Sequence, residues 1–359
     1  MSQGKVYGLY RQIVKQLPLK KWQGLCLAAM SVGIAEARSC WLSAVAERLG
    51  VLGKADSLTR RFQRFVSNPR VDVEACCSAW VGWVMSSWRS ERMVLLVDET
   101  KLANHLSMMM VGLAYRGRCI PLAWRCYPQD AWPMSQVELI DHLLGVVAAG
   151  LPMGWVPLVE ADRGIGTSPE LVRRIAARGW HFLFRVQSQT RFLSTDGQIC
   201  AVSQLARRGK SFSACGKVFK DAGWIAAFVH VIWHKGFAQP WCLITNSPSI
   251  HGSSYALRAW QEQGFRDLKS GGLHWNRSRL WNPDHANRLM LAITLAYAWI
   301  LSLGTAVIRA GRAARSAFTR GSDRRFSVFR LGLRHLSRQL VSFKPTLFRL
   351  IFVPAFPLC

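Results

Sequence analysis

The sequence predicts an α/β fold, with a helical region before it and a β-rich insertion inside it. Apolar residues recur at three-to-four spacing in Trp22–Ala37 and Trp41–Leu49, as they do in helices. From residue 92 to residue 186, short apolar runs alternate with helical periodicity, as in folds that pack helices beside a sheet. Residues 187–246 contain short, aromatic-rich runs between Gly and Ser, which predict strands.

The helical region, residues 1–88, contains a helix, a turn and a basic helix. Asp56 or Ser57 is expected to cap the basic helix, which should end before the Asn-Pro pair at 68–69. Three arginines project from an apolar frame in this helix: Arg60, Arg61 and Arg64. Such a unit is typical of DNA-contacting domains. A packing helix with a solvated basic face would show the same spacing.

Five strands and two helices make up the predicted α/β plan. Three apolar runs with short links predict a meander with strands at Met93–Thr100, Met108–Tyr115 and Cys119–Trp124. The elements expected after it are a helix at Gln136–Gly150, a strand at Trp155–Val159, a helix from Ser168-Pro169 to Ala177 and a strand at His181–Val186. Ligands gather at strand ends in such folds.

One long apolar segment, Leu289–Ile308, has no charged residue over 20 positions, which is enough to span a bilayer. It is the only such stretch in the chain, and it contains polar or small residues such as Thr294 and Gly304. We interpret it as a buried core helix, with a basic single-span membrane protein as the alternative. The Arg-rich region after Arg309 receives no predicted structure.

The charge balance predicts a polyanionic partner. The chain has 47 Lys and Arg residues against 20 Asp and Glu, a net charge of +27 and a pI near 10.7. Nucleic acid is the usual partner of such a surface, and an anionic membrane is the rival. The ten cysteines form no C-x-x-C pair, and the N-terminus lacks a secretory pattern. Both features favour a cytoplasmic protein with reduced thiols.

Two acidic residues follow predicted strands. Asp98 ends the first strand, and Asp162 lies just past the fourth. If these strands are neighbours, the two carboxylates converge. Carboxylate oxygens are the ligands that Mg²⁺ prefers. Acidic groups at strand ends are common, so this pair alone is weak evidence for a metal site.

A helix predicted from Ser253 or Ser254 to Lys269 adds a third carboxylate. At roughly 100° per residue, a stripe about 60° wide holds four of its side chains: Tyr255, Arg258, Glu262 and Lys269. The opposite side, fit for packing on the sheet, holds Ala256, Leu257, Trp260, Gly264 and Leu268. An ordinary amphipathic helix with a solvated charged face would show the same pattern.

The pattern Y-x2-R-x3-E-x6-K resembles the signature of bacterial insertion-sequence transposases of the DDE type. The runs LVDET and EADRGIG, the second followed by a helix and HFLFRV, resemble the blocks that carry the first and second aspartates of this family. The resemblance spans Arg92 to Trp281. It implies an RNase H-like catalytic domain at 89–305 with the β-rich insertion at 187–246. The helical domain at 1–88 would bind DNA ends, and 306–359 would form a basic tail.

The resemblance also implies a reaction. Asp98, Asp162 and Glu262 would hold two Mg²⁺ ions, for which Mn²⁺ can substitute, and catalyse in-line displacement at phosphorus. The enzyme would bind terminal inverted repeats of its own element, cleave there and transfer the 3′ strands to target DNA. A homodimer would hold two ends in a synapse, in the bacterial cytoplasm at the nucleoid and without a membrane partner. A non-catalytic DNA-binding repressor or remnant of the same fold is the alternative.

Further residues receive DNA-binding roles by resemblance and chemistry. Arg258 can grip phosphate bidentately, Lys269 adds a point charge and Tyr255 offers a hydroxyl. In relatives that cut through a DNA hairpin, a tryptophan at the position of Trp241 holds a flipped base. Where some relatives have a second aromatic residue, this chain has Ala259. Two lesser expectations concern Thr100, which could support the Asp98 carboxylate, and Arg163, which could contact the DNA backbone.

Overall fold

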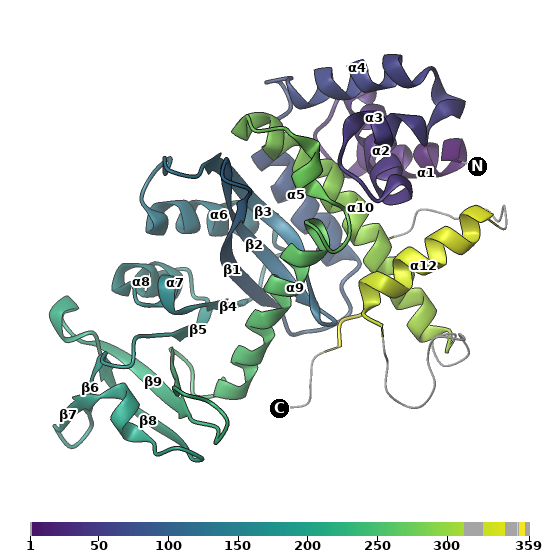
Figure 1. The fold of residues 1–359 in the computed structure, drawn as a ribbon. Coiled ribbons are helices and arrows are strands. Elements are labelled where there is room, and N and C mark those ends of the chain that lie inside the picture. Colours follow the sequence, from purple (N-terminus) through teal and green to yellow (C-terminus); the bar gives the residue numbers. More distant parts are fainter. Residues whose placement is uncertain (1, 312–325, 342–349, 351, 356–359) are drawn as a thin grey trace.

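Ten strands form one mixed sheet in the order β3-β2-β1-β4-β5-β10-β9-β8-β6-β7, with helices beside it (Figure 1). The structure is a computed structural model and describes residues 2–311, 326–341, 350 and 352–355. Part of the region for which the sequence predicted no structure lies outside these residues.

The first half of the sheet contains the predicted meander. Its strands are β1 (Val94–Leu102), β2 (Leu106–Tyr115) and β3 (Arg118–Pro128), which pair in antiparallel fashion. Two parallel strands extend the sheet beyond β1: β4 (Leu158–Ala161) and β5 (His181–Arg185). The fourth strand was predicted at residues 155–159 and instead begins at Leu158. Pro157, which precedes it, has no N–H to donate to a neighbouring strand.

The insertion continues the same sheet. Its strands are β6 (Arg191–Ser194), β7 (Ile199–Ala201), β8 (Ser211–Val218), β9 (Ile225–Ile232) and β10 (Trp241–Thr245). Two short 3₁₀ turns accompany them, η2 (Val202–Leu205) and η3 (Lys220–Ala222). Because β10 pairs with both β5 and β9, its side chains lie beside the end of the parallel strands.

Residues 2–86 are mostly helical, as predicted. The elements are α1 (Ser2–Gln16), α2 (Lys21–Ala37), α3 (Leu42–Glu47), η1 (Gly50–Leu52), α4 (Ala55–Val66) and α5 (Val73–Ser86). The basic helix α4 begins one residue before Asp56, with Lys54 at its N-cap, so the predicted cap was wrong. Asp56 lies in the first turn, where its negative charge suits the helix dipole.

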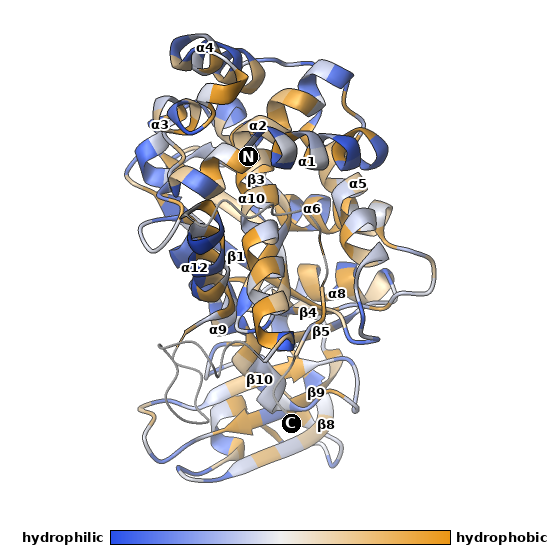
Figure 2. Cartoon of the chain, turned by 90° about the vertical axis from the view of Figure 1, so that its right-hand side faces the viewer, coloured by the Kyte–Doolittle hydropathy of each residue, from blue (hydrophilic) through white to orange (hydrophobic). Residues whose placement is uncertain are grey.

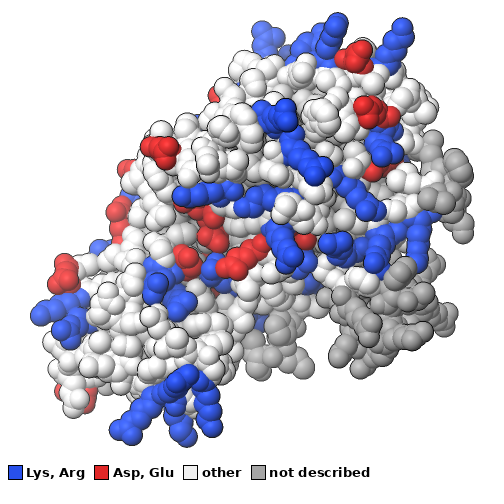
Figure 3. Space-filling model, in the orientation of Figure 1, with Lys and Arg blue, Asp and Glu red and all other residues white. Residues whose placement is uncertain are grey.

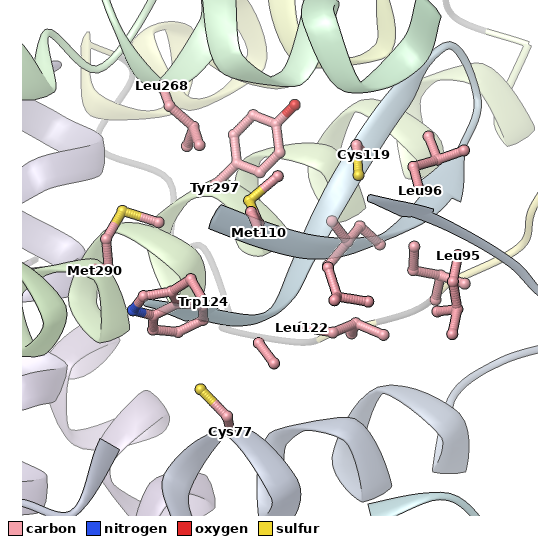
Figure 4. Packing of buried hydrophobic residues seen from close by; sticks show 14 of the residues in the cluster. Cys77, Leu95, Leu96, Met110, Cys119, Leu122, Trp124, Leu268, Met290 and Tyr297 are labelled. Atoms are coloured by element: carbon pink, nitrogen blue, oxygen red, sulfur yellow. The ribbon is translucent and has the colours of Figure 1, made fainter. Parts of the chain in front are cut away.

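Helices cover both faces of the meander. On one face lie α5 and α6 (Gln136–Gly150), and Trp80 of α5 donates a hydrogen bond to the Pro121 carbonyl of β3 at 2.9 Å. On the other lie α9 (Ala259–Leu268) and α10 (Pro283–Arg309). Figure 4 shows the strands between Cys77 of α5 and Tyr297 of α10. The short helices α7 (Arg163–Gly166) and α8 (Pro169–Ala177) pack beside β5.

The apolar segment forms the core helix α10. By length and composition α10 could cross a membrane, but 83% of its apolar window is buried inside the protein. The helix α10 packs against α2, α5 and β3, and Figure 2 shows it as a mostly hydrophobic helix in the middle of the molecule. The interpretation as a buried core helix is therefore confirmed.

A helix absent from the sequence prediction, α12 (Val328–Val341), packs along α10. Glycine makes this close approach possible. A Cβ at Gly304 would lie 1.9 Å from the Val328 carbonyl oxygen, and one at Gly332 would lie 1.9 Å from the Ile300 carbonyl oxygen.

Candidate active site

Two carboxylates lie at one edge of the sheet because their strands are parallel neighbours. Val97 of β1 is paired with Ala161 of β4, and the residue that follows each of them is an aspartate, Asp98 or Asp162. The two aspartates therefore occupy neighbouring positions. The expectation that these strands are neighbours is thus confirmed. Asp162 caps α7, and its Oδ1 accepts hydrogen bonds from the backbone N–H groups of Gly164 at 2.9 Å and Ile165 at 3.3 Å.

The segment that carries the signature pattern is not one continuous α-helix. Residues Gly252–Arg258 form a 3₁₀ turn, η4, and α9 begins at Ala259. A 3₁₀ turn has three residues per turn, so the predicted α-helical stripe fails for Tyr255. That residue is only 4% exposed, and Lys269 at the other end is the non-helical C-cap. The prediction that Gly264 faces the sheet is confirmed, since a Cβ there would lie 3.2 Å from Cys119 Cβ.

Arg258 joins the third carboxylate to the first. Its Nη1 donates to Asp98 Oδ2 at 3.0 Å, and its Nη2 donates to Glu262 Oε1 at 2.6 Å. The Asp98 side chain is 18% exposed, whereas that of Glu262 is 55% exposed. One guanidinium fork therefore bridges the middle of β1 and the first turn of α9. Asp98 was expected to end its strand, but β1 continues to Leu102.

The carboxylates are close enough to influence one another. Burial raises the pKa of Asp98 to about 6. The charges of Asp162 and Glu262 contribute to this rise, while Arg258 and the Glu99 N–H oppose it. Burial alone would lower the pKa of Arg258, but the charges of Asp98, Tyr255, Glu262 and Asp162 together outweigh it. Arg258 thus lies within the combined field of all three carboxylates.

This donor set fits a divalent cation in its chemistry and charge. Two of the three carboxylates accept hydrogen bonds from one guanidinium, and the third acts on it through its charge. Excess negative charge of this kind is what a divalent cation relieves. The side chains are not at metal-binding distance. Within the described residues, no group of three or more Asp, Glu, His or Cys side chains is placed to hold a metal. Asp98 and Glu262 both face Arg258, so coordination would require this guanidinium to move away.

Lys269 lies at the same edge. Its Nζ donates to Thr100 Oγ1 at 2.7 Å and to the Lys101 carbonyl oxygen at 3.1 Å. Burial lowers the pKa of Lys269, and the charge of Asp98 opposes this shift. Thr100 was expected to support the Asp98 carboxylate; in the structure it positions Lys269 instead, because the hydroxyl points to the C-terminal end of α9.

Aromatic side chains from the insertion reach the site. The Trp241 and Tyr255 rings meet edge to face with centroids 5.3 Å apart, and Phe237 lies 5.9 Å from Trp241. The Tyr255 hydroxyl is buried and has no hydrogen-bond partner among the described residues. Burial raises the Tyr255 pKa, and the charges of Arg258 and Arg185 lower it.

Sequence reasoning missed Phe237 and Arg185. Strand pairing could have indicated Arg185, because Ala161 is paired with Phe184 and the next residues along these parallel strands are Asp162 and Arg185. Nothing in the sequence pattern singled out Phe237. Arg163 lies beside the site on α7, where its Nη1 is 3.5 Å from Gln239 Oε1. The structure places Arg60, Arg61 and Arg64 elsewhere, exposed on α4.

A comparison with known families adds independent evidence. Residues 135–299 match the transposase DDE domain. This domain indicates a transposase or nuclease that acts on DNA, and the mixed sheet is consistent with an RNase H-like DDE domain. The match contains Asp162 and Glu262 but begins after Asp98, whose place beside them comes from strand pairing. No curated protein matches the sequence of this chain.

Proposed function

We propose that this protein is a cut-and-paste DNA transposase of the group with the Tyr-Arg-Glu-Lys signature, with Asp98, Asp162 and Glu262 as its catalytic carboxylates. One observation carries the proposal. Three acidic residues far apart in the sequence share one sheet edge, where their charges converge on Arg258.

Each part of the site has a proposed task. Two Mg²⁺ or Mn²⁺ ions held by the three carboxylates would supply activation of the attacking oxygen and stabilisation of the leaving oxygen. Arg258, once released from Asp98, grips a phosphate with its fork, and Lys269 places a second positive charge near the scissile strand. Tyr255 offers its unpartnered hydroxyl to a phosphate. Trp241 offers an aromatic face to an extruded base, and Arg163 contacts the backbone.

The remaining regions would organise the DNA. We assign recognition of the terminal repeats to residues 1–88, in which α4 exposes Arg60, Arg61 and Arg64. The catalytic domain would occupy 89–305 and the basic tail 306–359. Two copies would hold two ends in a synapse in the bacterial cytoplasm. A non-catalytic DNA-binding remnant is the second candidate, and the outcome of a cleavage assay separates the two.

The decisive experiment is strand cleavage. Duplexes taken from the DNA that flanks the coding sequence are incubated with purified protein, and nicks are mapped. We expect nicks at the repeat boundary with Mg²⁺ and none with EDTA. Glu262→Gln should slow nicking at least about a thousandfold, or about 4 kcal/mol of barrier.

The chain offers a matched control for Glu262. Glu170 has a similarly exposed side chain, 59% against 55%, and forms an i,i+4 ion pair with Arg174, although here the glutamate precedes the arginine. Glu170→Gln should therefore leave nicking unchanged. Equal nicking by the Glu262→Gln variant and the wild type would overturn the assignment of Glu262, and absence of nicking by every form would favour the remnant.

Metal binding can be tested without DNA. At a Mg²⁺ concentration about 100 times the Kd, binding to the folded chain should stabilise it by about 2.7 kcal/mol. Thermal unfolding of the wild type should shift upward accordingly. An equal shift in Asp98→Ala would exclude Asp98 as a ligand.

A further inference from the structure

The helix α12 carries a stripe of arginines on one face. Arg330, Arg334 and Arg338 are spaced by four residues, which places them in one row along the helix. Arg330 and Arg338 are exposed, and the Arg334 guanidinium lies 3.8 Å from the centroid of the Phe326 ring. Residues 326–341 contain no Asp or Glu. The opposite face is apolar and buried in the core through Val328, Phe329, Leu333 and Leu336.

Interactions near both ends of α12 link the stripe to α9 and to the N-terminal helices. At its N-terminal end, Arg330 is close enough to Asp267 to oppose the rise that burial causes in the pKa of that carboxyl. Asp267 lies in α9, five residues after Glu262. Further along α12, Ser337 accepts a hydrogen bond from Arg38, the exposed residue that ends α2. The stripe therefore extends from the helix of the third carboxylate to the N-terminal helices.

Figure 3 shows basic side chains gathered over α12, on the same face as the acidic side chains at the centre of the molecule. The row from Arg330 to Arg338 covers eight residues, or about 12 Å of helix. A duplex carries one phosphate charge per about 1.7 Å of its axis when both strands are counted, so an equal length of duplex contains about seven phosphates. A row of guanidiniums held by an apolar, buried face is complementary to such a backbone.

We propose that the Arg330–Arg334–Arg338 stripe of α12 binds the backbone of duplex DNA and holds it between the N-terminal helices and the carboxylate site. This inference deepens the proposed function, on which it rests, by naming a surface outside the signature residues. The contact is with phosphate and is independent of base sequence.

The test is the salt dependence of DNA binding. A fluorescein-labelled 40-base-pair duplex of arbitrary sequence is titrated with the full chain in EDTA, and Kd is measured by anisotropy from 50 to 200 mM KCl. Each phosphate contact contributes about 0.9 to the slope of log Kd against log salt, so Arg330→Gln/Arg338→Gln should lower the slope by about 1.8. Over this salt range the wild type should lose about tenfold more affinity than the double variant.

Two matched double variants test whether the change in slope comes from DNA contacts at α12 or from the lower net charge of the protein. Arg191→Gln/Lys220→Gln removes two exposed cations from the insertion, at or beside the far end of the sheet, and should leave the slope near that of the wild type. Arg330→Lys/Arg338→Lys keeps the charges and should retain the slope. Thermal unfolding checks that each variant is folded. If the double Gln variant is not folded, the two single Gln variants replace it, and each is expected to lower the slope by about 0.9.

An unchanged slope in a folded double variant would overturn the proposal, as would an equal loss in the insertion control. Either result would mean that α12 has a solvated basic face or meets an acidic protein. Because the duplex is arbitrary and no metal is present, these outcomes are independent of whether the enzyme cleaves repeat ends.

Discussion

Two buried aspartate–arginine pairs flank α9, and they differ in their surroundings. In both, burial raises the carboxyl pKa to about 6. Asp98 pairs with Arg258 and also lies in the field of Asp162 and Glu262, which contribute to the rise in its pKa. Asp267 pairs with Arg118, and its other neighbours, the Tyr297 hydroxyl and Arg330, stabilise its charge.

The difference separates a structural ion pair from a candidate site. Around Asp267, the charges and hydrogen bonds of Arg118, Tyr297 and Arg330 all favour the ionised carboxylate, and burial opposes them. Around Asp98, the charges of Asp162 and Glu262 disfavour ionisation, whereas Arg258 favours it. A group of carboxylates with excess negative charge gains from added cations, whereas a compensated pair does not. Carboxyl groups whose pKa is raised by neighbouring carboxylates, as at Asp98, are the ones expected at functional sites.

The largest expected effect on the free energy of unfolding comes from breaking the Asp267–Arg118 ion pair. Asp267→Ala leaves the Arg118 guanidinium, 13% exposed, without its carboxylate. Removing one partner of a buried pair costs about 3–5 kcal/mol. The free energy of unfolding in urea should fall by this amount. A loss below about 1 kcal/mol would contradict the view that this pair is structurally required.

A medium effect of opposite sign is expected at Asp98. In the metal-free chain, Asp98→Asn should raise the free energy of unfolding at pH 7.5 by about 1–3 kcal/mol, since each pKa unit is worth about 1.4 kcal/mol. Arg258 keeps Glu262 as its partner in this variant. Greater stability of the wild type at this pH would contradict the prediction.

The pH dependence of the Asp98→Asn effect follows from the raised pKa. Below about pH 4 the Asp98 carboxyl is mostly protonated in both folded and unfolded chains, so burying its charge does not lower the free energy of unfolding. As pH rises from about 4 to about 6, the unfolded chain ionises first and wild-type stability falls by this contribution. The difference between wild type and Asp98→Asn should therefore grow over this window and level off above pH 6. Urea unfolding at several pH values measures it.

The smallest expected effect is at Thr100. Thr100→Val removes one acceptor from Lys269, which keeps the Lys101 carbonyl. We expect a stability loss of about 1 kcal/mol or less and a twofold to fivefold slower nicking rate. Thr100→Ser, which keeps the hydroxyl, serves as the control. A rate loss as large as that of the Glu262→Gln variant would mean that Thr100 does more than position Lys269.

The sequence alone predicted much of the local structure and the candidate carboxylates. The apolar run before Asp162 correctly indicated a strand end, and the helix at Gln136–Gly150 has the predicted bounds. The expectation that Asp98 ends its strand was wrong, because β1 stays paired with β2 as far as Leu102. The sequence could not show that β1 and β4 pair, because pairing between strands far apart in the sequence leaves no local pattern. The 3₁₀ turn at Tyr255 was missed for a related reason, since the segment packs where Gly252 lets it approach His230 of β9.

Residue types, their spacing and the charge balance were determined by the sequence, and they predicted an α/β fold, a carboxylate trio and a polyanionic partner. Tertiary structure alone decided that Arg258 lies between Asp98 and Glu262, that Thr100 serves Lys269 and that α12 carries an arginine stripe on the face of the site. The physical reason is distance. Electrostatic coupling depends on separation in space, and only packing brings residues 98, 162 and 262 together and residue 330 near residue 267.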